Sequence, residues 1–281
     1  MNSPQVSVIC LCYNHELYVE KAIRSIQNQS YPNVQLIVVD DDSTDKSKAV
    51  ISKALSGSLK AQFISLTQNV GNCKAFNIGL AAATGDFIID HSGDDILMLD
   101  RIEKGVKAFS EQGNKVGVNF TDAQLIDEAG KLLGYHSDKF PHDSIPQGNI
   151  YSDVLSRYFI NSPSMMIRRE VFEKLGGYDE SLAYEDFDFW VRSSRYFDYS
   201  YTPEPLVKRR IHSSSMGKRQ YKRGSRQLQS TLKVCEKALA LNTNKGENDA
   251  LRKRIHYEFR QALKLGELRL AKDYWSLLRR V

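Results

Sequence analysis

Short apolar runs rich in β-branched residues alternate with helical patterns throughout residues 6–89. The runs typical of strands are Val6–Leu11, Val34–Val39, Phe63–Leu66 and Phe87–Ile89. Asn14 is a candidate N-cap for the first intervening helix, and Ser43 or Thr44 for the second. The third intervening helix is expected over Ala75–Ala83, ended by Gly85. This β-α-β-α-β-α-β order predicts a doubly wound α/β sheet with helices on both faces.

Polar residues follow each predicted strand. They are Cys12-Tyr13-Asn14, Asp40-Asp41-Asp42, Gln68-Asn69 and Asp90 to Asp95. In open α/β sheets, ligands bind beyond the carboxyl ends of the strands. The sequence therefore predicts that these clusters meet at one ligand site.

The second half of the chain is less regular. We expect a strand over Val116–Phe120, then a hairpin over Ala123–Leu133 that turns at 128–130. The polar stretch Tyr135–Gly148 is expected to be a loop, and Met165–Ile167 a strand followed by a helix that ends before Gly176-Gly177. A helix with acidic residues in its first turn is expected near Glu185, and a strand over Leu206–Ile211. The sheet is therefore expected to be mixed.

Composition places the chain among ordinary globular proteins. Its 281 residues are 41% hydrophobic and 26% charged, and no apolar run reaches the roughly 18 residues of a membrane span. The N-terminus has no basic and apolar leader, so we expect a cytoplasmic protein. None of Cys10, Cys12, Cys73 and Cys235 has zinc-ligand spacing, and all four are predicted to be core thiols.

Charge is distributed unevenly along the chain. Residues 1–207 contain 19 Lys+Arg and 28 Asp+Glu, a net of −9, whereas residues 208–281 contain 20 and 6, a net of +14. Helical patterns broken at 242–248 run through the basic part. We therefore expect two parts, a main domain over 1–215 and a basic helical extension over 216–281, with different partners.

The cluster Asp90-His91-Ser92-Gly93-Asp94-Asp95 brings three carboxylates together in six residues. Mg²⁺ and Mn²⁺ are commonly held by one or two carboxylates together with substrate phosphates. A helix N-terminus also favours aspartates, and a helical pattern follows this cluster. Spacing alone leaves both interpretations open.

Four ordered blocks resemble the family 2 glycosyltransferases of the GT-A fold, together covering roughly residues 5–215. The blocks are VSVICLCYNHELYVEKAIRSIQNQSYPNVQLIVVDDDSTDKS, NVGNCKAFNIGLAAATGDFI, GGYDESLAYEDFDFWVR and RRIHSSS. The resemblance implies a GT-A sheet and transfer of a sugar from a nucleotide-diphosphate donor, a UDP-sugar above all. The Gln-x-x-Arg-Trp pattern of processive synthases is absent from the sequence, which favours one transfer per encounter.

The resemblance implies a metal site for Mn²⁺ or Mg²⁺. The family motif is Asp-x-Asp followed by Asp, and Ser92 replaces the first of these aspartates. Asp94 matches the metal ligand, Asp95 follows it in the donor site, and a Ser92 hydroxyl could take over part of the lost role. Asp90, on the same strand face as Ser92, is a second candidate for that role. His212 is implied to approach the metal or the diphosphate, although a lone His is more often structural.

The resemblance also implies the catalytic base and the donor contacts. Asp186 matches the carboxylate that deprotonates the acceptor hydroxyl in an inverting reaction, although first-turn acids of a helix are common without any such role. Asp41 is expected to bind the base, and its alternative is a solvated turn. The other donor contacts implied are Leu11, Tyr13, Asn14, Gly71 and Lys74. Trp190 is expected in the core rather than against a sugar.

Other classes of function remain open at this point. Ser92 leaves room for a catalytically weak nucleotide-sugar-binding protein. The basic extension contains Tyr221, Tyr257, Tyr274 and Trp275, a mixture that nucleic-acid-binding proteins also show, but the acidic main domain argues against nucleic acid. We expect the extension to touch anionic lipid at the inner face of the plasma membrane, with a solvated helical face as the alternative. The expected acceptor is a saccharide or lipid-linked saccharide of surface polysaccharide assembly.

Overall fold

A computed structural model describes residues 3–57, 61–140, 144–212 and 221–281. Four parallel strands form the first half of one nine-stranded sheet, in the order β3-β2-β1-β4. Their bounds are β1 Val6–Cys12, β2 Val34–Asp40, β3 Ala61–Ser65 and β4 Phe87–Ser92. Each predicted strand is present. β4 continues three residues further than expected, into the polar cluster.

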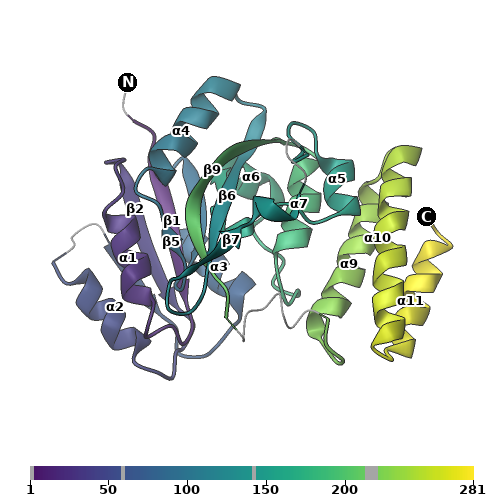
Figure 1. The fold of residues 1–281 in the computed structure, drawn as a ribbon, viewed down its shortest axis with the longest axis horizontal. Coiled ribbons are helices and arrows are strands. Elements are labelled where there is room, and N and C mark those ends of the chain that lie inside the picture. Colours follow the sequence, from purple (N-terminus) through teal and green to yellow (C-terminus); the bar gives the residue numbers. More distant parts are fainter. Residues whose placement is uncertain (1–2, 58–60, 141–143, 213–220) are drawn as a thin grey trace.

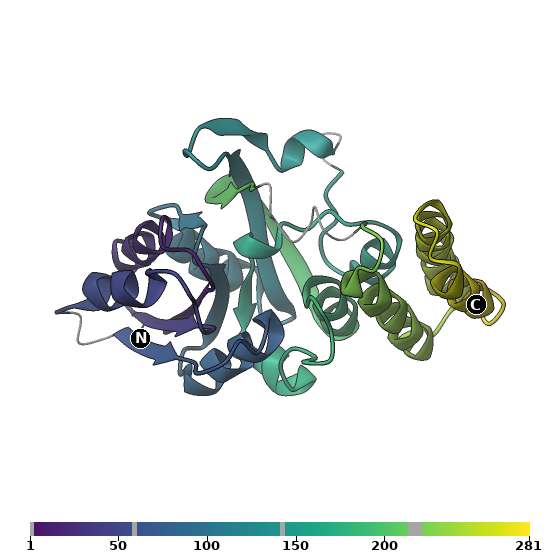
Figure 2. The same ribbon diagram turned by 90° about the horizontal axis from the view of Figure 1, so that it is seen from below.

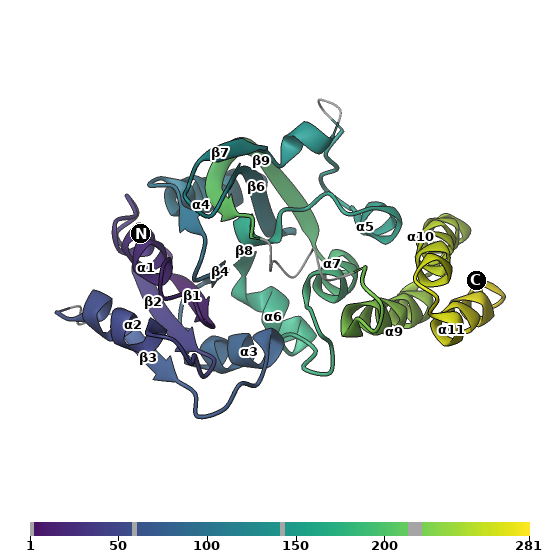
Figure 3. The same ribbon diagram turned by 60° about the horizontal axis from the view of Figure 1, so that its bottom comes forward.

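Helices cover both faces of this half of the sheet (Figure 3). They are α1 Val19–Gln27, α2 Ser47–Leu55, α3 Asn72–Ala82 and α4 Arg101–Gln112. Val8 and Cys10 of β1 pack in one core with α1, α2 and α4, whereas Ile9 and Leu11 pack in the other with α3. Alternate side chains of β1 therefore pack into the two hydrophobic cores on opposite faces of the sheet. The predicted doubly wound α/β sheet is confirmed.

The second half of the sheet is mixed and follows β4 in the order β8-β6-β9-β5, with β7 paired to β6. The strands are β5 Ile96–Leu97, β6 Val116–Ile126, β7 Leu132–Tyr135, β8 Met166–Arg168 and β9 Asp198–Arg210. β6 and β9 run parallel along most of their length, with register shifts near Thr121–Ala123. The predicted hairpin is present as β6 and β7.

β9 begins eight residues before the strand expected at Leu206. Pro203 and Pro205 argued against a strand in this part of the sequence, because a proline has no backbone N–H to donate to the ladder. The structure accommodates Pro205 at the register shift opposite Asp122, where the ladder is already irregular. β6 is likewise one strand where a strand and a separate hairpin arm were expected.

Short helices connect the strands of the second half. They are α5 Tyr151–Ser156, α6 Arg169–Leu175 and α7 Asp186–Ser194, with single 3₁₀ turns at Ser137–Lys139 and Ser162–Ser164. Gly176 ends α6 in the left-handed conformation, at φ +73°, as its position predicted. The 3₁₀ turn at Ser137–Lys139 lies within the segment Tyr135–Gly148 that was expected to be a loop.

The C-terminal helices are α9 Arg226–Leu241, α10 Lys245–Lys264 and α11 Leu268–Leu278. They lie at the end of the molecule opposite α1 and α2 (Figures 1 and 2). The predicted break after Leu241 is present but shorter than the expected 242–248, because α10 already begins at Lys245. The second break, before α11, was not expected. Their apolar sides join the core that contains α5 and α7. The predicted boundary at 215/216 and the residues Ser213–Ser215 lie outside the described residues.

Two further sequence expectations can be compared with the structure. All four cysteines are free and buried, as expected of core thiols. Within the described residues, no helix has both the length and the apolar character that crossing a bilayer requires.

Candidate active site

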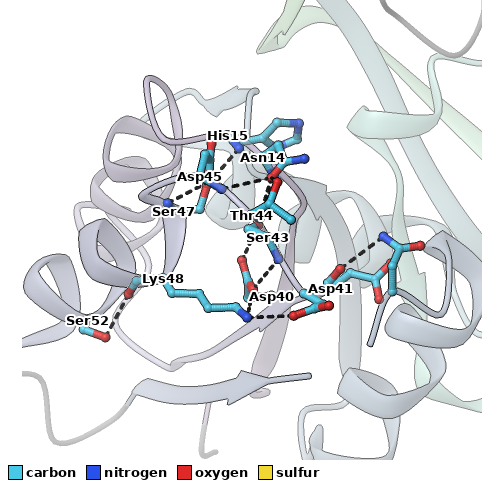
Figure 4. A network of polar contacts seen from close by, with 12 residues as sticks. Asn14, His15, Asp40, Asp41, Ser43, Thr44, Asp45, Ser47, Lys48 and Ser52 are labelled. Atoms are coloured by element: carbon cyan, nitrogen blue, oxygen red, sulfur yellow. Dashed lines mark hydrogen bonds and ion pairs between the residues drawn. The ribbon is translucent and has the colours of Figure 1, made fainter. Parts of the chain in front are cut away.

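The loops after β1 and β2 are tied together by side-chain hydrogen bonds (Figure 4). Asn14 has a positive φ of 58°, and its backbone N–H donates to Ser43 Oγ at 2.9 Å. Asn14 Oδ1 accepts from Thr44 N at 2.8 Å. Ser43 Oγ in turn donates to the buried Asp40 at 2.5 Å. The network fixes the edge of the sheet where the chain leaves both strands.

These contacts correct the two predicted helix caps. Asn14 does not cap α1, since that helix begins four residues after Asn14, at Tyr18–Val19. Ser43 and Thr44 do not cap α2 either, because α2 begins at Ser47 without a side-chain cap. Loop-to-loop bonding is the competing use of the same polar side chains.

Asp41 anchors the start of α3. Its two carboxylate oxygens accept the backbone N–H groups of Val70 and Gly71, at 2.8 and 2.9 Å. Asn69 Nδ2 donates to the Asp41 carbonyl at 3.1 Å. Gly71 has φ +86°, a conformation that favours glycine, and it immediately precedes α3. Asp41 thus positions the loop in which donor binding was predicted.

The other predicted donor contacts differ in exposure. Leu11 is buried, and its carbonyl accepts from Gly93 N at 2.7 Å, which joins the end of β1 to the acidic motif. Tyr13 is 47% exposed at the mouth of the same edge. Lys74 lies exposed on α3. Leu11 is therefore part of the frame of the site, whereas Tyr13 and Lys74 are open to a ligand.

The acidic motif follows a strand rather than opening a helix. β4 runs to Ser92, β5 follows at Ile96, and the next helix begins only at Arg101, after Asp100. The helix N-terminus interpretation of Asp94 and Asp95 is therefore wrong. These carboxylates lie in the turn between β4 and β5, beside the loop after β1.

Asp94 is held by two neighbours. Ser92 Oγ donates to Asp94 Oδ1, and His212 Nε2 lies 2.7 Å from Asp94 Oδ2. Burial alone would raise the pKa of Asp94. The hydrogen bonds from His212 and Ser92, with the charge of His15, instead hold that pKa well below its usual range. Ser92 therefore supports Asp94 from the position that the first motif aspartate usually occupies.

Asp95 points into the protein. It is 3% exposed, and its Oδ1 accepts the backbone N–H of Arg210 at 2.7 Å. Arg210 Nε also donates to the Asp94 carbonyl at 3.0 Å. Burial, followed by the charge of Asp94, raises the pKa of Asp95 well above its ordinary value. Asp95 joins the motif to β9, a contact that leaves Asp94 as the outward carboxylate.

A second acidic group forms where β4 meets the start of α7. Tyr178 Oη donates to Asp90 Oδ2 at 3.1 Å, and Asn72 Nδ2 donates to Glu185 Oε2 at 2.8 Å. Burial, together with the charge of Asp186 and against the Tyr178 bond, raises the pKa of Asp90 to about 7. Burial and the charges of Asp186 and Asp90 raise the pKa of Glu185 well above its ordinary value.

Asp186 is the first residue of α7 and is partly accessible. Burial raises its pKa, while a hydrogen bond from Ser162 and the charge of Arg209 oppose that rise. A carboxyl with a raised pKa accepts a proton more readily near neutral pH. Asp90 is therefore grouped with Asp186, whose charge acts on its pKa, and the one hydrogen bond of its carboxylate in the described structure comes from Tyr178 rather than Ser92.

Other acidic and aromatic residues of this block are structural. Asp188 is 1% exposed and ion-paired with Arg192 at 2.7 Å and with Lys237 at 2.6 Å. Trp190 is 4% exposed within the core, as predicted. Asp188 is therefore held in structural ion pairs, and its carboxylate is not free to take a proton from a substrate.

Sequence reasoning missed six residues around the two acidic groups. They are His15, Asn72, Ser162, Tyr178, Arg209 and Arg210. The only available signal was the pair of arginines directly before Ile211-His212, which alternate across β9. Arg210 binds the motif backbone, and Arg209 is the cation whose charge acts on both Asp95 and Asp186.

The donor set fits a divalent cation that also binds substrate oxygens. Within the described ranges, no three His, Cys, Asp or Glu side chains form a ready metal-ligand group. Asp94 and His212 are adjacent, however, and the buried nitrogen His15 Nδ1 has no hydrogen-bond partner in the described structure. A Cβ at Gly93 would lie 3.1 Å from that nitrogen, so glycine permits the close approach. Carboxylate with imidazole suits Mn²⁺, with phosphate oxygens completing the shell.

Comparison with solved structures identifies the fold. S. aureus TarS residues 1–349 in complex with UDP-GlcNAc superpose with a TM-score of 0.71 at 18% identity, over 91% of this chain and 73% of that one. The mannosyltransferase PcManGT of Pyrobaculum calidifontis, solved with GDP-Man and Mn²⁺, gives a TM-score of 0.65 at 17% identity, over 100% and 75%. The mixed sheet with its covering helices is the GT-A fold.

Sequence relatives identify the family. An uncharacterized glycosyltransferase of Haemophilus influenzae is 40% identical over 193 residues, which are 68% of this chain and 72% of the relative. One of Rickettsia typhi is 32% identical over 217 residues, which are 75% of this chain, and the chain spans only 65% of that relative. The family model "Glycosyl transferase family 2" matches residues 7–176. The chain belongs to the glycosyltransferase family 2.

Proposed function

We propose that this chain moves one sugar per encounter, with inversion, from a nucleotide-diphosphate donor to a hydroxyl of a saccharide or lipid-linked saccharide. The observation that carries the proposal is the meeting of two groups at one edge of the sheet. Asp94 with His212 lies after β4, and Asp186 lies at the start of α7, near Asp90 of the same strand. The group around Asp94 is suited to bind the leaving diphosphate, and the group around Asp186 is suited to deprotonate the attacking hydroxyl.

The acceptor hydroxyl must lose a proton as it attacks. Asp186 would take that proton, and its raised pKa suits a base that works near neutral pH. Attack from the side opposite the leaving group inverts the anomeric carbon. Asp188 is ion-paired and buried, and Glu185 is bound by Asn72. Asp186 is therefore the carboxylate of this segment best placed to serve.

Asp94 and His212 would hold Mn²⁺ or Mg²⁺. When bound, the cation supplies positive charge to the leaving nucleoside diphosphate. Arg209 adds a fixed positive charge that acts on both acidic groups, since it opposes the rise in the pKa of Asp95 and of Asp186. Ser92 keeps Asp94 oriented through its hydroxyl. The loop anchored by Asp41 and Gly71 would bind the nucleotide.

A UDP-sugar is the proposed donor, since TarS is solved with UDP-GlcNAc. PcManGT is solved with GDP-Man and Mn²⁺, so the nucleotide varies among proteins of this fold. The proposed setting is the assembly of surface polysaccharide. A screen of UDP-, GDP- and dTDP-sugars with Mn²⁺ or Mg²⁺, read by nucleoside diphosphate release, tests the activity.

NMR of the product's anomeric centre tests inversion in the same screen. Metal-dependent release with an inverted product is the expected result. Donor binding without release for any donor would instead favour the catalytically weak nucleotide-sugar-binding protein, which the replacement of an aspartate by Ser92 also permits.

We further propose that the α10–α11 face docks on an anionic membrane surface. Exposed apolar and basic side chains alternate along α11, in the order Leu268, Lys272, Trp275 and Arg279. The spacing of four, three and four places them on one side of the helix. Trp275 packs against Phe259 of α10 at 5.8 Å between ring centroids, which joins the two helices into one face.

Two of the four aromatic residues named in the extension are exposed enough to reach lipid. Tyr274 is fully buried, and Tyr221 donates to Glu258, so neither is on this face. Tyr257 and Trp275 are 45% and 53% exposed. Each Lys or Arg near an anionic surface contributes about 1 kcal/mol, and aromatic rings prefer the interface.

Tryptophan fluorescence tests this face directly. The chain has two tryptophans, and Trp190 is buried. We expect a blue shift of Trp275 emission with vesicles of phosphatidylglycerol and phosphatidylcholine at low salt, lost at high salt. Lys272→Glu should weaken the shift, and Trp275→Phe should remove it. An unchanged spectrum with anionic vesicles would contradict membrane docking by this face.

A further inference from the structure

The C-terminal helix α9 holds the segment that carries Glu185 and Asp186. Ala183 N donates to Ser230 Oγ at 2.9 Å, and Tyr184 Oη lies 2.7 Å from Thr231 Oγ1. Both contacts fall within three residues of Asp186. Residues 47 apart in sequence thus fix the approach to α7, and α9 lies beside α7 in Figures 1 and 3.

Lys237 of α9 bridges the same segment across its length. Its Nζ lies 2.5 Å from Asp179 Oδ2 and 2.6 Å from Asp188 Oδ1. One bridged carboxylate precedes Asp186 by seven residues and the other follows it by two. Asp188 is 1% exposed and also receives Arg192 Nε at 2.7 Å. Lys237 therefore links the two ends of residues 179–188, the stretch that contains Asp186 and that we call the tied loop.

The opposite side of this loop is bound to helix α3 and strand β4. Asn77 Nδ2 donates to the Tyr178 carbonyl at 2.9 Å, and Tyr178 Oη reaches Asp90. Asn72 holds Glu185. The loop is thus clamped between α3 and β4 on one side and α9 on the other. Lys237 contacts carboxylates that lie outside the reacting centre.

We propose that Lys237 is a positioning residue for the catalytic base, and that α9 is therefore part of the catalytic unit. This inference rests on the proposed role of Asp186. Lys237 fixes Asp179 and Asp188, these fix the two ends of the tied loop, and the loop sets where the Asp186 carboxylate meets the acceptor hydroxyl. Among the described residues, the side-chain bonds of Lys237 go to Asp179 and Asp188 and not to the donor site around Asp94.

The expected effect is on turnover rather than on donor affinity. A misplacement of a reacting group by about 1 Å can cost about 10²-fold in rate. Lys237→Met keeps most of the length of the side chain and removes its ammonium group, which leaves Arg192 as the one cation paired with Asp188 in the described structure. We expect kcat to fall about tenfold or more, while the Kd for UDP with Mn²⁺ stays within about twofold.

Matched variants separate positioning from general damage. Lys233→Met removes an exposed lysine one turn earlier on α9 and should leave kcat unchanged. Lys237→Arg keeps a cation that can bridge two carboxylates and should restore most of the rate. If Lys237→Met does not fold, Thr231→Val removes the contact to Tyr184 with little change of shape, and the same loss of kcat is expected.

The decisive measurement is kcat of Lys237→Met in wild-type and Asp186→Asn backgrounds. If Lys237 acts by placing Asp186, the substitution should cost little once the base is removed. Equal losses in both backgrounds would overturn the positioning role. Wild-type kcat for Lys237→Met, with Asp186→Asn inactive, would also overturn it and leave the general-base proposal intact. Near-normal turnover of Asp186→Asn would instead overturn the base assignment.

Discussion

Replacing Asp90 with Asn should stabilise the protein, and more so at pH 8 than at pH 5. Asp90 lies at the end of β4 with a pKa raised to about 7, chiefly by burial, against an ordinary value of 3.8. Between these values the folded state holds a proton that the unfolded chain has lost. The stability that this proton supplies is complete below pH 3.8 and is lost as the pH rises through about 7.

The difference between the two pKa values sets the magnitude. Each unit of difference in pKa corresponds to about 1.4 kcal/mol. The raised pKa of Asp90 therefore lowers the free energy of unfolding by about 4 kcal/mol at pH 8 and by about 2 kcal/mol at pH 5. Asn cannot ionise, and its Oδ1 can still accept the Tyr178 hydroxyl. The gain in unfolding free energy of Asp90→Asn should therefore be larger at pH 8, by about 2 kcal/mol.

Urea unfolding at both pH values measures this gain from the full chain. Asp249→Asn, at an exposed position on α10, serves as the control for the change of residue type. A gain for Asp90→Asn that is equal at pH 5 and pH 8, or a loss of stability at pH 8, would refute the reasoning. Either result would mean that the pKa of Asp90 is not raised in the folded protein.

Three further outcomes follow from the contacts of the motif and of the extension. Asp94→Ala should abolish metal-dependent donor binding in calorimetry, a loss of several kcal/mol of charge stabilisation, and unchanged Mn²⁺-dependent affinity would contradict the metal role. Ser92→Asp should retain donor binding in the same assay, whereas loss of binding with an intact fold would mean that the hydroxyl itself is needed. Truncation after Ser215 should prevent folding, as judged by solubility and circular dichroism, because Tyr151 and Phe187 lose the C-terminal helices that cover their core. A soluble truncated protein that binds UDP would show that the N-terminal part folds alone.

The first half of the fold could be predicted because its signals are local. β1 and β2 are continuous apolar runs, and the spacing of Val19, Ala22, Ile23 and Ile26 marks the buried side of α1. β9 was predicted too short because Pro203 and Pro205 are normally excluded from a ladder, and only the register shift against β6 accommodates them.

The site could be predicted in part because some of its residues lie in local sequence motifs. Asp94 and Asp186 were singled out by their motifs, and in the structure Asp94 lies beside His212 and Asp186 lies near Asp90. The Tyr178–Asp90 contact joins residues 88 apart and depends on how the loop before α7 packs on β4, which no local pattern encodes. The bridge from Lys237 to Asp188 is also non-local. Such contacts become visible only once the tertiary arrangement is known.

Turnover of Asp186→Asn tests the central claim most directly. The substitution keeps the shape of the side chain and removes its basicity, so release of nucleoside diphosphate to acceptor should fall by about 10²-fold or more. Binding of UDP with Mn²⁺ should remain near that of the wild type, since Asp94 and His212 are untouched. Acceptor-dependent turnover within a few-fold of the wild type would contradict the account, because the proton would then be taken by another group.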